Sequence, residues 1–202
     1  MTGKPHDWPS TRETLIGRLK AEPGGPDWDL FVEIYAPLIH RFCRRRGVQD
    51  ADARDVTQNV FLAVRRGIKR FTYDPERGKF RSWLGTIAAR EVVRQEKSAR
   101  RAGQATAASH PALHATDHDA TWIVEFNSHV YQTALDRIQP RFDPTTWQAF
   151  ELLWKQDKSA AEVARKFRKT PDWVYQVKFR VLRRLEEEVK FLTADIASFS
   201  KE

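Results

Sequence analysis

The 202-residue chain carries 35 Lys and Arg against 27 Asp and Glu, a net charge of +8, so it is drawn to polyanions such as nucleic acids, acidic substrates or membrane surfaces. Its single cysteine, Cys43, excludes an internal disulfide framework and a multi-cysteine zinc site. No run of about 18 apolar residues and no apolar signal core in MTGKPHDWPS is present, so we expect a cytoplasmic protein without a membrane span.

Apolar residues recur at helical spacing along most of the chain, and strand signals are almost absent. The pattern predicts an all-α protein. The expected helices cover roughly residues 10–21, 27–46, 50–68, 80–101, 121–138, 144–156, 159–168 and 171–191.

Residues 102–120 are rich in Ala, Thr, Ser and His and contain only one large aliphatic residue, so they cannot bury enough surface to fold alone. We therefore expect two small helical domains, at residues 10–101 and 121–191, joined by a flexible linker over 102–120. A C-terminal tail over 192–202 follows, and apolar residues at near-helical spacing in and just before it favour packing on the second domain over binding a regulator. These residues are Phe191, Leu192, Ile196 and Phe199.

The expected helix over 50–68 has two different faces. Val56, Val60 and Ala63 form an apolar face, and a second face combines polar side chains with one leucine at the spacing of helical neighbours. A polar face with an exposed leucine indicates a docking surface, and an ordinary solvated face is the alternative. The residues of this face are Asp55, Gln58, Asn59 and Leu62.

The expected helix over 80–101 begins with an apolar stripe and ends in a cationic segment that could lie along phosphates. A loop with aromatic and basic side chains, FTYDPERGK at 71–79, precedes it, and this mixture suits unstacked bases. The candidate contacts to a melted strand are Tyr73, Arg77, Lys79, Arg81, Arg90 and Arg94.

Residues 159–189 have the layout of a helix-turn-helix DNA reader. Ser159 is a suitable N-cap with Glu162 at the capping-box position, and Thr170 and Pro171 are suited to start the second helix. Between Arg165 and Arg184 there are eight Lys and Arg and one acidic residue, which favours nucleic acid over a merely solvated helix.

The two sides of the second helix carry different kinds of residue. Val174, Val177, Val181 and Leu185 recur at core spacing, and the opposite side carries polar, basic and aromatic residues that suit a major groove. The candidate contacts are Asp172, Gln176, Phe179, Arg180 and Arg183 to bases and Lys169, Lys178 and Arg184 to phosphates.

From about residue 28 to 189, the order of these pieces resembles the extracytoplasmic-function (ECF) sigma factors of bacterial RNA polymerase. The resemblance rests on DARDVTQNVFL at 52–62, on FRSWLGTIA at 80–88 and on the helix-turn-helix. It implies a dissociable, cofactor-free subunit with core RNA polymerase and promoter DNA as partners, and an anti-sigma factor as a possible third. The first domain would be region 2-like, binding the clamp helices through the face around Leu62 and melting the minus-ten element. The second would be region 4-like and read the minus-thirty-five element.

The sequence departs from many members of that family at a few positions. They often have an acidic residue at Asn59, an Asn at Arg90 and an Asp near Arg94. The second helix of the helix-turn-helix is bulkier than usual, through Trp173, Tyr175 and Phe179, so its base preference cannot be taken from relatives.

Two other classes of function remain as alternatives. A DNA-binding repressor that never touches polymerase would account for the C-terminal half but not for the Leu62 face or the Trp83 helix. An enzyme is disfavoured because no P-loop, dinucleotide-binding turn, HExxH or nucleophile elbow is present. His110, His114 and His118 have a zinc-compatible spacing, but Pro111 and the surrounding composition favour solvated linker histidines.

Overall fold

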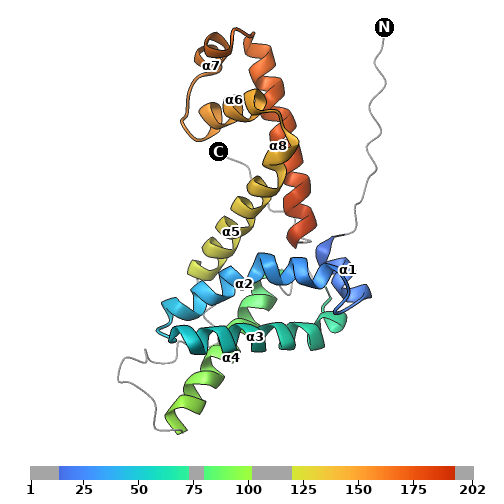
Figure 1. Cartoon of the computed structure of the whole chain (residues 1–202), viewed down its shortest axis with the longest axis vertical. Helices are drawn as coiled ribbons and strands as arrows, with labels where there is room; N and C mark the ends of the chain where they lie inside the picture. Colours follow the sequence, from blue (N-terminus) through green and yellow to red (C-terminus); the bar gives the residue numbers. More distant parts are fainter. Residues whose placement is uncertain (1–13, 73–79, 102–119, 194–202) are drawn as a thin grey trace.

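The computed structural model describes residues 14–72, 80–101 and 120–193 (Figure 1). The described residues form helices and no strand, so the predicted all-α class is confirmed. The α-helices are α1 (Leu15–Ala21), α2 (Asp27–Arg45), α3 (Asp50–Gly67), α4 (Phe80–Arg101), α5 (Ala120–Ile138), α6 (Pro144–Trp154), α7 (Ala160–Phe167) and α8 (Pro171–Thr193). Short 3-10 turns, η1 (Ile68–Arg70) and η2 (Gln139–Arg141), follow α3 and α5.

The observed helices begin and end close to the residues that the sequence predicts. α4 covers the predicted range, α6 ends two residues early at Trp154, and α8 continues two residues further, to Thr193. α1 is capped by Thr14, whose Oγ1 accepts from the N–H of Gly17 at 3.1 Å. Residues 10–13, expected to open that helix, lie outside the described residues.

Helices α1 to α4 enclose an aromatic core. Phe31 of α2 lies at its centre, with its ring centroid 5.8 Å from Phe61 of α3 and 6.2 Å from Phe80 of α4, both edge-on. Edge-to-face pairs of this kind add about 0.5–1.5 kcal/mol to the free energy gained by burial alone. These contacts fix the angle between α3 and α4, the two helices that carry the predicted functional residues of this half.

Helices α5 to α8 form the second helical part. Val174, Val177 and Val181 of α8 are fully buried against α5, α6 and α7. Glu188 of α8 is 1% exposed, and its Oε1 accepts from Nε of Arg137 in α5 at 2.7 Å. Because an unpaired buried carboxylate is costly, this ion pair fixes how α5 and α8 pack.

Helix α5 contacts both parts, as its course in Figure 1 shows. Its C-terminal half packs along α8, and its N-terminal half packs on α2 and α4. There the ring of Trp122 lies 5.0 Å from Phe42, and that of Phe126 lies 5.8 Å from Tyr35. The Trp122 indole N–H donates to the carbonyl of Arg81 at 2.8 Å, so the contact also has a directional bond.

The C-terminal end of α8 returns to the first helical part. Tyr35 of α2 donates its hydroxyl to the carbonyl of Leu192 at 3.0 Å, and the guanidinium of Arg18 in α1 lies over the Phe191 ring at 5.6 Å. Phe191 and Leu192 are buried, and these contacts join the end of α8 to the first helical part. Ile196 and Phe199 lie outside the described residues.

Candidate nucleic-acid interface

Helix α3 presents the predicted docking face to solvent. Val56 and Val60 are buried on its inner side, and on its outer side Leu62 is 52% exposed. The charge pattern suits the helix dipole, with Asp50 and Asp52 in the first turn and Arg65 and Arg66 in the last. Three more exposed residues share the face of Leu62. They are Asp55, Gln58 and Asn59, so the structure brings the whole predicted set together.

Helix α4 carries three of the predicted strand contacts, and their surroundings differ. Arg90 and Arg94 are exposed, and Arg94 lies 3.7 Å from the carboxylate of Glu91. Arg81 is half-buried instead, and its Nη1 donates to Oδ1 of Asn127 in α5 at 3.2 Å. The other three predicted contacts lie outside the described residues; they are Tyr73, Arg77 and Lys79.

The helix-turn-helix consists of α7, a short turn and the N-terminal part of α8. The predicted capping box is present: the Glu162 carboxylate accepts from the Ser159 N–H at 2.9 Å, and the Glu162 N–H donates to Ser159 Oγ at 3.3 Å. The bonds from the Ser159 side chain and backbone hold the pKa of Glu162 below its usual value. Thr170 caps α8 as predicted, accepting from the Trp173 N–H at 3.3 Å.

The turn between α7 and α8 depends on Arg168, whose conformation the sequence does not indicate. Arg168 ends α7 in the left-handed region, with φ of 54°, where glycine is the usual choice. Its own N–H and that of Lys169 then reach back to carbonyls of α7, at 3.2 Å and 2.9 Å. These bonds set the direction in which α8 leaves the turn.

The exposed face of α8 is basic and lies opposite its valine core. Asp172, Gln176, Phe179 and Arg180 are exposed on this face, and Arg183 joins them with its side chain 49% exposed and 3.6 Å from Glu187. The predicted base-facing residues therefore share one surface. The predicted phosphate contacts lie at its edges; they are Lys169, Lys178 and Arg184.

Aromatic rings hold two of these edge lysines. The ammonium of Lys169 lies 6.0 Å from the Trp173 ring, and that of Lys178 lies 5.8 Å from the Trp154 ring. A cation above an aromatic face is attracted by about 0.5–1 kcal/mol at an exposed site. Arg184 is instead paired with Glu187 at 2.9 Å.

Tyr175 lies on this surface but is not among the DNA contacts predicted from the sequence. Its side chain is 59% exposed and lies one helical turn before Phe179, which is 66% exposed. The signal was its position four residues before Phe179 on the polar side of the helix. The exposed face of α8 therefore carries an aromatic pair as well as basic residues.

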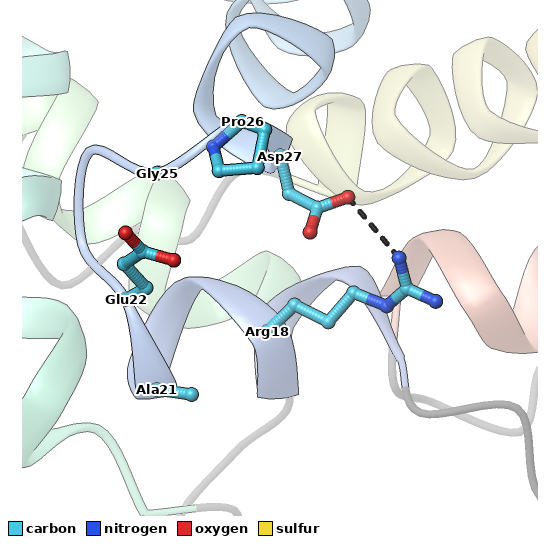
Figure 2. A pocket seen from close by; sticks show the side chains of 6 residues that line it. All are labelled: Arg18, Ala21, Glu22, Gly25, Pro26 and Asp27. Carbon is cyan, nitrogen blue, oxygen red and sulfur yellow. Dashed lines mark hydrogen bonds and ion pairs between the residues drawn. The ribbon is translucent and has the colours of Figure 1, made fainter.

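A small polar pocket lies where α1 turns into α2 (Figure 2). The ion pair between Arg18 and Asp27 at 3.3 Å lies on one side, and Glu22 lies on the other. Gly25 lies against Glu22, and an added Cβ would come within 2.7 Å of the Glu22 carboxyl carbon, a contact that this exposed side chain could relieve by moving. The pocket is formed by the turn between α1 and α2.

The predicted linker histidines His110, His114 and His118 lie outside the described residues. Among the helices of the described ranges, none has the length and hydropathy of a membrane span.

Residues 31–102 match the family model Sigma-70 region 2. This segment covers most of α2 and all of α3 and α4, with the exposed face of α3 and the basic end of α4. The chain thus has a sigma-70 region 2 domain, and this family is non-enzymatic and binds core RNA polymerase and promoter DNA in transcription initiation.

Comparison with curated proteins gave no match. Among solved structures, a chain of the RsbN–BldN complex is similar, with 22% identity and a TM-score of 0.34, over 85% of this chain and 97% of that chain.

Proposed function

We propose that this protein is a sigma factor of the ECF class and contacts its partners through three surfaces on two domains. The observation that carries the proposal is the combination in one chain of an exposed polar face with Leu62 on the region 2 domain and a helix-turn-helix with an exposed basic face. The domains are those expected from the sequence, residues 10–101 and 121–191. The cytoplasm, where polymerase acts, is the expected location.

The first surface is the exposed face of α3, which we assign to the clamp helices of core polymerase. Leu62 supplies apolar area that is out of contact with the protein's own core, and Asp55, Gln58 and Asn59 supply hydrogen-bonding groups around it. An apolar centre with a polar rim is the usual composition of a protein–protein interface.

The second surface is the basic side of α4, which we assign to the melted strand of the minus-ten element. Arg90 and Arg94 are exposed and sit one turn apart, a spacing that suits successive phosphates. Arg81 would exchange its bond to Asn127 for a bond to the strand. Tyr73, Arg77 and Lys79 of the preceding segment complete the assignment.

The third surface is the exposed face of α8, which we assign to the major groove of the minus-thirty-five element. Asp172, Gln176, Phe179, Arg180 and Arg183 face the bases. Lys169, Lys178 and Arg184 lie along the edges of that face and contact phosphates, where a positive charge adds affinity without sequence preference.

Two variants, one on the α3 face and one on the α8 face, test this assignment because each should impair binding to a different partner. Gln58→Ala combined with Leu62→Ala should weaken binding to core polymerase and leave duplex binding unchanged, because both side chains are exposed. Arg180→Ala should do the reverse. Binding of both variants to core polymerase and to promoter duplex, with helicity as the fold control, is the measurement. A repressor would bind duplex but show no affinity for polymerase even as wild type.

Base contacts and phosphate contacts in the third surface are expected to differ in their salt dependence. Arg180→Ala or Arg183→Ala should cost on the order of 1–3 kcal/mol of binding and relax preference at one base pair. Lys169→Ala should weaken binding to all sequences alike and reduce the salt slope. Affinities across salt concentrations and single-base variants of the duplex separate the two. A uniform loss in both arginine variants would contradict this orientation of α8.

An anti-sigma factor is the further partner that the ECF class implies, and we propose it as the regulator of this chain. It would have to cover either the Leu62 face of α3 or the basic face of α8. Competition between the regulator and core polymerase for the purified chain tests this proposal.

A further inference from the structure

An exposed pair of aromatic rings on α8 lies outside the hydrophobic core of the described residues. Large apolar side chains exposed in the described residues are Leu62, Val124, Tyr175 and Phe179, and the last two are adjacent on one helix face. Burial of large apolar side chains is favourable, so two neighbouring rings in water leave considerable binding energy unused. Neighbouring exposed rings, unlike scattered single ones, mark a binding surface.

The pair lies inside the basic face of the helix-turn-helix, which identifies its occupant as DNA. Phe179 is followed on the same stripe by Arg183 one turn later, and Gln176 and Arg180 lie beside it. Lys169 holds its positive charge at the start of the same surface. A protein partner would gain little from so many cations, whereas the phosphates on both sides of a major groove complement them.

The chemistry of the groove then selects one group for the rings to contact. Base edges in the major groove present donors and acceptors, and the thymine C5 methyl is their one apolar group. A ring placed on a donor or acceptor would remove water from it without replacing the hydrogen bond, which is unfavourable. A ring placed on a methyl group buries apolar surface on both sides.

We propose that Tyr175 and Phe179 read thymine methyl groups in the upstream promoter element, and this inference rests on the function proposed above. The two residues are separated by four helical positions, about 6 Å along the axis. That distance is close to two base-pair steps of about 3.4 Å each. The rings therefore contact thymines in neighbouring or next-neighbouring base pairs, and the arginines read the flanking pairs.

Replacing thymine by deoxyuridine tests the proposal because it removes the methyl group and leaves the pairing unchanged. The duplex is first selected from a randomised library by the full chain, with and without core polymerase. At one or two thymine positions, uracil should then lower wild-type affinity about fourfold each, the effect of leaving one methyl-sized group unburied. The position read by Phe179 should lose its thymine preference in Phe179→Ala, and the one read by Tyr175 in Tyr175→Ala.

Arg180→Ala serves as the matched control on the same face. It should lower affinity for the thymine and uracil duplexes by the same factor, so their ratio stays at the wild-type value. Far-UV circular dichroism checks that the aromatic variants keep their helices, as expected for side chains that are 59% and 66% exposed.

Three outcomes would overturn the proposal. If uracil and thymine duplexes bind the wild type equally at every position, the rings do not read methyl groups. If Tyr175→Ala and Phe179→Ala keep duplex binding and its thymine preference but lose polymerase binding, the pair docks a protein. If no duplex is selected under either condition, the proposed promoter function fails, and the inference fails with it.

Discussion

Cys43 illustrates how the fold sets the chemistry of a single residue. It lies in α2 and is fully buried in the core of the first helical part. Burial raises the pKa of its thiol to about 12, although the nearby Arg46 charge acts in the opposite direction. Because the thiolate is the reactive form, this cysteine should be inert in the native protein.

Thiol labelling at about pH 8 measures this effect. The native chain should react with a disulfide reagent far more slowly than the urea-unfolded chain, since both access and thiolate formation require opening of the core. Labelling of the native chain as fast as a free thiol peptide would show that Cys43 is not buried as described.

Single residues were predictable from the sequence where the interaction is local. Ser159, Glu162 and Thr170 were identified as caps because a cap acts over three residues, and their bonds are present. Arg168 was not identified, because a left-handed φ at a non-glycine residue has no sequence signal. The environment of Arg81 was missed for a different reason, since its partner Asn127 is 46 positions away.

At the scale of elements, the helices followed from apolar periodicity, but the packing of α5 did not. Its buried residues recur at helical spacing, which predicts a helix with a core-facing stripe. The pattern does not say that the first turns of that stripe pack on α2 and α4 and the later ones on α8. The exposed faces of α3 and α8 were predictable because an amphipathic helix defines its outer side by itself.

His129 makes the packing of α5 on α2 sensitive to pH. Its Nε2 lies 2.6 Å from the Ile34 carbonyl and its Nδ1 lies 3.0 Å from Nη2 of Arg41. Burial lowers the pKa of His129 from 6.5, the Arg41 charge lowers it further, and the bond to the Ile34 carbonyl partly opposes them. A neutral ring that donates to the carbonyl and accepts from Arg41 fits both distances.

Acidification should therefore destabilise the wild-type protein through this residue. Because the native pKa is below the unfolded value, the stability from the neutral ring is full above pH 6.5 and is lost as the pH falls through the native pKa. Urea unfolding at about pH 7.5 and about pH 5.5 should show a larger loss for wild type than for His129→Gln. Equal losses in the two proteins would mean that His129 does not cause the loss of stability at low pH.

At the scale of the whole molecule, the contact between α4 and α5 is one of those that hold the two helical parts together. Gly85 of α4 leaves room for the indole of Trp122, and a Cβ at this position would lie 2.5 Å from Nε1 of that ring. The ring is buried and bonded to the Arg81 carbonyl, so it cannot move aside at low cost.

Gly85→Ala should therefore destabilise the protein by about 1–3 kcal/mol, the usual cost of overpacking a core, even though alanine is the better helix former. In a Trp122→Ala background the clash is gone, and the same change should be neutral or stabilising by up to about 1 kcal/mol. Free energies of unfolding for the four proteins of this cycle are the measurement. A Gly85→Ala effect of the same sign and size in both backgrounds would mean that α5 does not dock on α4 as described.

As a sigma factor, this chain should direct core polymerase to promoters that share an upstream and a downstream element. Transcription by purified core polymerase from a randomised promoter library, with sequencing of the transcript ends, tests it most directly. We expect transcripts only when the chain is added, all starting downstream of a common two-part sequence, and we expect Gln58→Ala combined with Leu62→Ala to abolish them. Duplex binding by the chain without any chain-dependent transcript would contradict the claim and identify a DNA-binding repressor instead.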